Sequence, residues 1–168
     1  MVNRRLTAAL LKRLEGEPHR RLRYFCSPQH TEQCLYSVIG QMERAAGLAY
    51  GDTALLKLDK LDALLAQTST SKQDAALFAE MLSLTNDGRY AALNMNPQQC
   101  RQRTLEALTA QVATLSRQNP VLMIFEDAHW TDPTSREAFG RVVDRVFSLP
   151  VLLIVTIGRE FPHALRAP

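Results

Sequence analysis

Apolar residues recur every three or four positions in several segments of the chain, and this spacing predicts helices. Start and stop signals support their limits, such as the glycines at positions 16 and 47 and the Asn96-Pro97 and Asp132-Pro133 pairs. The predicted helices cover residues 4–15, 35–46, 53–67, 73–84, 97–118 and 133–147.

The helix predicted over residues 53–67 carries a stripe of leucines, which we expect to face the core. Asp52 precedes it and is a candidate cap. The stripe consists of Leu55, Leu58, Leu61, Leu64 and Leu65. Residues 68–72 are polar and predict a linker, and residues 85–96 contain Asn86-Asp87-Gly88, which predicts a surface loop.

Two continuous apolar runs have the length of strands. Residues 121–125 are uniformly apolar, which predicts a strand buried on both faces of a sheet, and residues 151–157 form a second run of the same kind. A helix predicted between them makes a parallel strand–helix–strand unit. Residues 21–26 alternate and predict a third strand. The fold class is therefore α/β with a parallel sheet.

Composition narrows the class of protein. The chain has 168 residues, 46% of them hydrophobic and 22% charged, which is typical of one globular domain. Three cysteines without a CxxC pair argue against a disulfide scaffold, and no apolar run is long enough for a membrane span. We therefore expect a cytoplasmic protein that does not contact membrane.

The charge is only +3, but seven of the basic residues lie in the first 23 positions. Such a block could contact nucleic-acid phosphates. Solvated helix and strand faces explain it better, because few aromatic residues are interleaved with it. We therefore do not expect nucleic acid as a partner.

The segment after the first apolar run carries the most informative chemistry. Glu126 and Asp127 follow that strand directly, and ligands of open parallel sheets bind at the carboxyl ends of the strands. Two acids at this place could hold Mg²⁺ and orient an attacking water. An apolar run followed by two acids is also the Walker B pattern, although many buried strands end in acids for other reasons.

Cys26, His30 and Cys34 follow C-x3-H-x3-C spacing and are possible zinc ligands. A structural zinc site needs a fourth protein ligand, for which the sequence offers no evident candidate. A polar loop at the end of a strand is the preferred interpretation.

The runs FEDAHWTDPTS, RLRYFCSPQHT, LDKLDALLAQTSTS and NPVLMIF resemble the ATPase module of large bacterial regulators. These are signal-transduction ATPases with numerous domains, of the AAA-like origin-recognition type, linked to class III adenylate or guanylate cyclases. The resemblance covers almost the whole chain. It implies a P-loop NTPase fold with strand order 5-1-4-3-2, which binds ATP and Mg²⁺ and switches an output domain.

The resemblance also implies roles for single residues. Glu126 matches the acid on the Mg²⁺ side, Asp127 matches the acid that orients water, and His129 and Trp130 match the signature that follows. Arg159 matches a sensor-like arginine that the family places one position earlier, where this chain has Gly158.

The sequence departs from the family most strongly in its glycines. None of its seven glycines belongs to a GxxxxGK or GxGxxG motif, so residues 1–168 contain no loop that could cradle phosphates. We therefore expect a partial ATPase domain with strands two, three and four, with weak or no ATP binding. It would comprise a helix and strand in residues 1–26, a helical segment in 34–118, and the Walker B strand, helix and next strand in 121–161.

A truncated sheet leads to a further expectation about association. The strand at 151–157 would be an unpaired apolar edge, and such edges favour self-association. An alternative to the impaired ATPase is a non-enzymatic interaction fragment or the product of a decaying gene.

Overall fold

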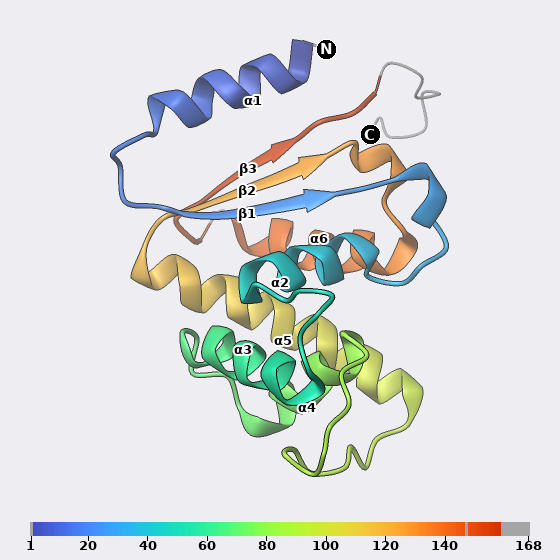
Figure 1. Cartoon of the computed structure of the whole chain (residues 1–168). Helices are drawn as coiled ribbons and strands as arrows, with labels where there is room; N and C mark the ends of the chain where they lie inside the picture. The colour runs from blue at the N-terminus through green and yellow to red at the C-terminus, as the bar shows by residue number, and fades with distance from the viewer. Residues whose placement is uncertain (1, 147, 159–168) are drawn as a thin grey trace.

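The computed structural model describes residues 2–146 and 148–158, which form an α/β fold around a parallel three-stranded sheet (Figure 1). The strands lie in the order β1-β2-β3, and Leu22, Met123 and Leu153 occupy one row across the sheet. The strands are β1 (Arg20–Phe25), β2 (Val121–Glu126) and β3 (Val151–Val155). The predicted parallel strand–helix–strand unit is confirmed. Strand β3, predicted over residues 151–157, ends at Val155.

The central strand β2 is buried on both faces, as its uniform apolarity predicts. All six of its residues are buried, and Ile124 is completely inaccessible. Helix α1 lies against one face of the sheet, and three helices cover the other face (Figure 1). The bounds are α1 (Val2–Arg13), α2 (Tyr36–Ala46), α5 (Pro97–Gln118) and α6 (Pro133–Val146). The result is a helix–sheet–helix layering.

The helical segment between β1 and β2 has its own apolar cluster. Helices α3 (Ala54–Ala66) and α4 (Lys72–Met81) pack with α2 and α5 below the sheet (Figure 1). The cluster includes Met42, Leu58, Leu61, Leu65 and Phe78. Within the described residues, no helix has both the length and the apolarity needed to cross a membrane.

The start of α3 differs from the sequence-based prediction. Thr53 is the N-cap, and its hydroxyl accepts the amide of Leu56 at 3.2 Å. Asp52 lies one residue too early for that role; it accepts the Ala49 amide and the Lys60 ammonium, each at 2.7 Å. Leu55 is 56% exposed, because the buried stripe runs through Leu58, Leu61 and Leu65.

Helix α4 and the loop after it differ in detail from their predictions. The helix ends at Met81 rather than at residue 84, and Ser83 has a left-handed backbone with φ of 53°. The loop of residues 85–96 contains no helix or strand, as predicted, but Tyr90 is buried. Its hydroxyl donates to Asp62 at 2.5 Å, and Arg89 donates to the same carboxylate at 2.8 Å. These contacts attach the loop to α3.

Asp132 confirms the predicted cap of α6 and also reaches a second helix. Its Oδ1 atom accepts the Ser135 amide at 2.8 Å in the first turn of α6. The same atom accepts the Leu35 amide at 3.0 Å, where Leu35 precedes α2 with φ of 59°. Asp132 is only 3% exposed, so water cannot readily reach the two amides if the carboxylate is removed. Losing these hydrogen bonds would therefore lower the stability of the protein.

We expect Asp132→Ala to lower the free energy of unfolding by about 2–4 kcal/mol, since it removes a cap and leaves two buried amides without acceptors. Urea unfolding followed by circular dichroism measures this loss. Asp132→Asn keeps an acceptor oxygen and should lose less, while Asp144→Ala on the exposed face of α6 should stay within about 0.5 kcal/mol of wild type. Equal losses for Asp132→Ala and Asp144→Ala would contradict the double cap.

Candidate functional site

The chain turns sharply after β2, and this turn carries the predicted acids. Asp127 has a left-handed backbone with φ of 55° and precedes a 3-10 turn at Ala128–Trp130. Its amide donates to the Thr156 hydroxyl at 3.0 Å, and the Ala128 amide donates to the Thr156 carbonyl at 2.9 Å. Thr156, just beyond β3, therefore holds the turn in place.

Glu126 ends β2 in a buried environment, with 8% of its surface exposed. Its Oε1 atom accepts two bonds from the guanidinium of Arg23 on β1, the one from Nε at 3.1 Å. Arg23 is itself anchored, because Arg44 of α2 donates to its carbonyl at 2.9 Å. The carboxylate of Glu126 is thus neutralised by an ion pair between adjacent strands.

The two guanidinium groups near this ion pair also share an aromatic ring. Arg23 and Arg44 lie 5.0 Å and 4.8 Å from the centre of the Phe25 ring. Phe25 is 38% exposed at the end of β1. Cation–π contact stabilises this cationic cluster beside the acids.

His129 packs against the segment that follows β3. Its Nδ1 atom accepts the Gly158 amide at 3.2 Å, so that nitrogen carries no proton in this arrangement. A Cβ atom at position 158 would lie 2.8 Å from Cε1 of His129. A side chain at position 158 would therefore require the His129 ring to move. Arg159 lies outside the described residues.

Cys26 adjoins the acidic turn and is held by it. Its amide donates to the Glu126 carbonyl at 3.1 Å, and its thiol lies 3.1 Å from the Thr131 hydroxyl. Burial raises the pKa of the Cys26 thiol, which favours the neutral form over the thiolate that zinc requires.

The other two residues of the C-x3-H-x3-C pattern make separate contacts. Cys34 accepts a hydrogen bond from Thr134 at 3.7 Å, while His30 stacks on Tyr36 at 3.9 Å and its buried Nδ1 lacks a hydrogen-bond partner. Among residues 2–146 and 148–158, no three His, Cys, Asp or Glu side chains are grouped as a metal site requires.

The structure therefore brings Glu126, Asp127 and His129 to one end of the sheet. Carboxylate and hydroxyl oxygens from Glu126, Asp127 and Thr156 are of the hard type that Mg²⁺ prefers. The Arg23 guanidinium already binds the Glu126 carboxylate. A cation would therefore have to share this carboxylate with Arg23 or displace the guanidinium from it. Sequence reasoning missed the roles of Arg23 and Thr156, whose places depend on strand pairing.

We expect Gly158→Ala to destabilise the protein by about 1–3 kcal/mol, because the new methyl group overlaps the His129 ring. Thermal unfolding of single and double variants measures the effect, which should largely disappear in the His129→Ala background. Gly140→Ala in α6 meets nothing within 4 Å and should instead stabilise by roughly 0.5–1 kcal/mol. A Gly158→Ala loss that persists without the His129 ring would refute the overlap.

Comparison with known proteins adds one similarity. The chain is 26% identical over 155 residues to an uncharacterized protein of Rhizobium meliloti (strain 1021), an alignment that covers 90% of this chain. The chain spans about 15% of the length of that relative. No family model matches the sequence, and no solved structure matches it.

Proposed function

We propose that the chain is part of the ATPase module of a signal-transduction regulator, and that it supplies the acidic edge of the nucleotide site. The observation that carries the proposal is the position of Glu126 and Asp127 at the carboxyl end of a fully buried central parallel strand. In this proposal ATP with Mg²⁺ is the ligand, and hydrolysis of ATP drives a switch in a neighbouring domain.

The strand arrangement supports the proposal. The order β1-β2-β3 agrees with strands two, three and four of the order 5-1-4-3-2 in the resembled family. Glu126 ends the central strand β2, and Asp127 follows it. Thr156 follows β3, the neighbouring strand, at the same edge of the sheet. Parallel sheets place such residues side by side because all their strands end at one edge.

Each residue has a proposed task. Glu126 would hold the magnesium ion, directly or through water, and Asp127 would orient the attacking water. Mg²⁺ would supply charge neutralisation at the phosphates. Arg23 would keep Glu126 extended along the sheet edge, and His129 would hold the segment after β3 through Gly158.

The glycine content predicts weak binding by residues 1–168 alone. The backbone amides and the lysine of a phosphate-binding loop normally supply most contacts to the β- and γ-phosphates. No such loop occurs among these residues. The chain would therefore need a glycine-rich segment, from the same or another polypeptide, for tight binding.

We expect titration calorimetry to show no saturable binding of Mg-ATP to residues 1–168. A version extended by a first strand and glycine-rich loop from a regulator of the resembled family should bind. In that version, Glu126→Gln and Asp127→Asn should each reduce ATP turnover by about 100-fold or more. Glu80→Gln, which alters an exposed carboxylate on α4, is the matched control.

Two results would reject this proposal. One is full turnover in both the Glu126→Gln and the Asp127→Asn versions. The other is a folded extended version that does not bind Mg-ATP. Micromolar binding by residues 1–168 would instead show that other groups replace the phosphate-binding loop.

The edge strand β3 favours a second candidate function, association between copies of the chain. Leu152 and Val155 are 52% and 41% exposed, and Ile157 beyond them is 43% exposed. In the part of the chain that the structure describes, no strand pairs with the outer side of β3. The opposite edge, β1, carries arginines, and charged edges resist pairing.

We expect light scattering after gel filtration to show an average mass that rises with protein concentration. Leu152→Lys combined with Val155→Lys should restore a monomer, because buried ammonium groups oppose pairing of the edges. Leu55→Lys, at an equally exposed leucine of α3, should leave the association unchanged. A wild-type chain that stays monomeric at all concentrations would exclude this function.

A further inference from the structure

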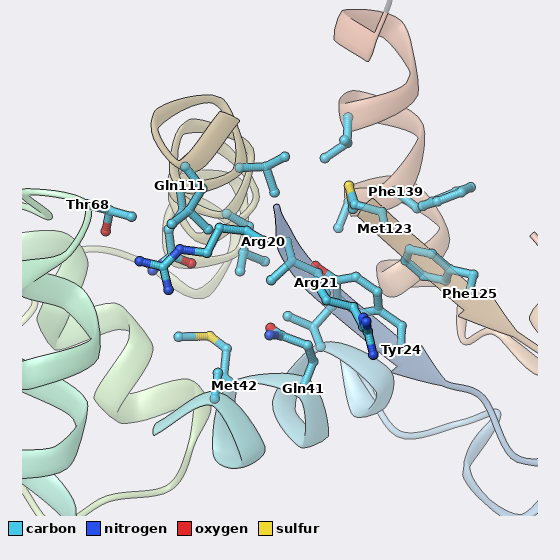
Figure 2. Close-up of a pocket in the computed structure, with 18 of the residues that line it drawn as sticks. Arg20, Arg21, Tyr24, Gln41, Met42, Thr68, Gln111, Met123, Phe125 and Phe139 are labelled. Carbon is cyan, nitrogen blue, oxygen red and sulfur yellow. The ribbon is translucent and has the colours of Figure 1, made fainter. Parts of the chain in front are cut away.

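A cavity of about 420 Å³ lies beneath the sheet, on the face covered by α2, α5 and α6 (Figure 2). Residues of both apolar clusters line it, among them Met42 of the helical segment and Val112 of the cluster under the strands. Small-molecule sites in proteins have volumes of roughly 300–1,000 Å³, so this cavity is large enough for a ligand.

The interior of the cavity is apolar, and its residues come from all the surrounding elements. Met123 and Phe125 form the roof from β2, and Phe139 and Val142 line it from α6. Leu22, Val38, Met42, Leu108, Val112, Leu115 and Ala138 complete the apolar wall. An alkyl chain would find van der Waals contact on every side.

Arg20 and several uncharged polar residues lie at the end of the cavity nearest the start of β1. Figure 2 shows Arg20, Thr68 and Gln111 at one end of the cavity, and the rings of Phe125 and Phe139 at the other. Arg20 and Arg21 are exposed, and neither guanidinium has a carboxylate partner among the described residues. None of the residues that line the cavity is acidic. The mouth is therefore cationic.

Tyr24 brings a hydroxyl group to the cavity lining. It lines the cavity, is 6% exposed and stacks on Phe125 with ring centres 4.3 Å apart. Its hydroxyl has no hydrogen-bond partner in the described part of the chain, and burial raises the pKa of this phenol.

We propose that this cavity binds an amphipathic carboxylate, with an alkyl chain among the apolar residues and a carboxylate at Arg20, while Arg21 adds positive charge at the same mouth. The two arginines, the uncharged amides of Gln41 and Gln111 and the absence of lining acids select an anionic head group over a neutral or cationic one. The site lies at the amino end of the strands, away from Glu126 and Asp127, and does not depend on nucleotide binding.

Octanoate and 1-octanol are matched probes, since they share an alkyl chain and differ in charge. We expect octanoate to bind saturably in calorimetry, to raise the melting temperature, and to bind more tightly than 1-octanol. Arg20→Gln combined with Arg21→Gln should weaken octanoate binding about tenfold and leave 1-octanol binding unchanged. Arg117→Gln on α5, outside the lining residues, controls for loss of surface charge.

A further variant tests the cavity itself. Ala138→Leu places extra side-chain volume in the cavity and should abolish binding of both probes, with folding checked by circular dichroism.

Several results would show that the cavity does not bind an amphipathic carboxylate. It is overturned if octanoate does not bind, if 1-octanol binds as tightly as octanoate, or if the double arginine variant binds octanoate like the wild type. Unchanged binding in a folded Ala138→Leu variant would place the ligand elsewhere and also overturn it.

Discussion

The burial of β2 on both faces is the constraint on which the remaining structure depends. A strand with no solvent-facing side must have a neighbour on each edge and a helix layer on each face. Met123 packs with Ala138 and Val142 of α6 in the cluster under the sheet, and Ile124, the next residue along the strand, faces the opposite side, where it is also buried. Functional polar side chains can therefore occur only beyond the apolar run, and Glu126 is the first of them.

Asp132 and Thr156 connect the segment after β2 to the neighbouring elements through hydrogen bonds. Asp132 ties the start of α6 to the start of α2, so two helices under the sheet share one buried acceptor. Thr156 ties the acidic turn to the end of β3. The candidate site is therefore built from backbone amides and short polar side chains whose positions follow from the layers.

Local patterns predicted the elements, because apolar runs, prolines and glycines act within a few residues. The buried strand at 121–125 and the Asn96-Pro97 helix start are examples. Thr53 was missed as a cap because Asp52 beside it is equally suited by type. The pairing of Arg23 with Glu126 and the hydrogen bond from Tyr90 to Asp62 depend on contacts distant in sequence. The position of Glu126 and Asp127 at the end of a buried strand was predictable. The partners of these acids, and the cavity beneath the sheet, depend on the packing of side chains.

The separation of β1 from β2 along the chain has a consequence for the order of folding. Arg23 and Glu126 pair across 103 positions of sequence, whereas contacts within α3, α4 and their loops are local. Closing a long loop costs entropy that only the finished sheet repays, and non-local pairing slows folding. A helical segment that collapses first would shorten the effective loop and bring the strand ends together. The helical segment between the two strands would then help the sheet to form.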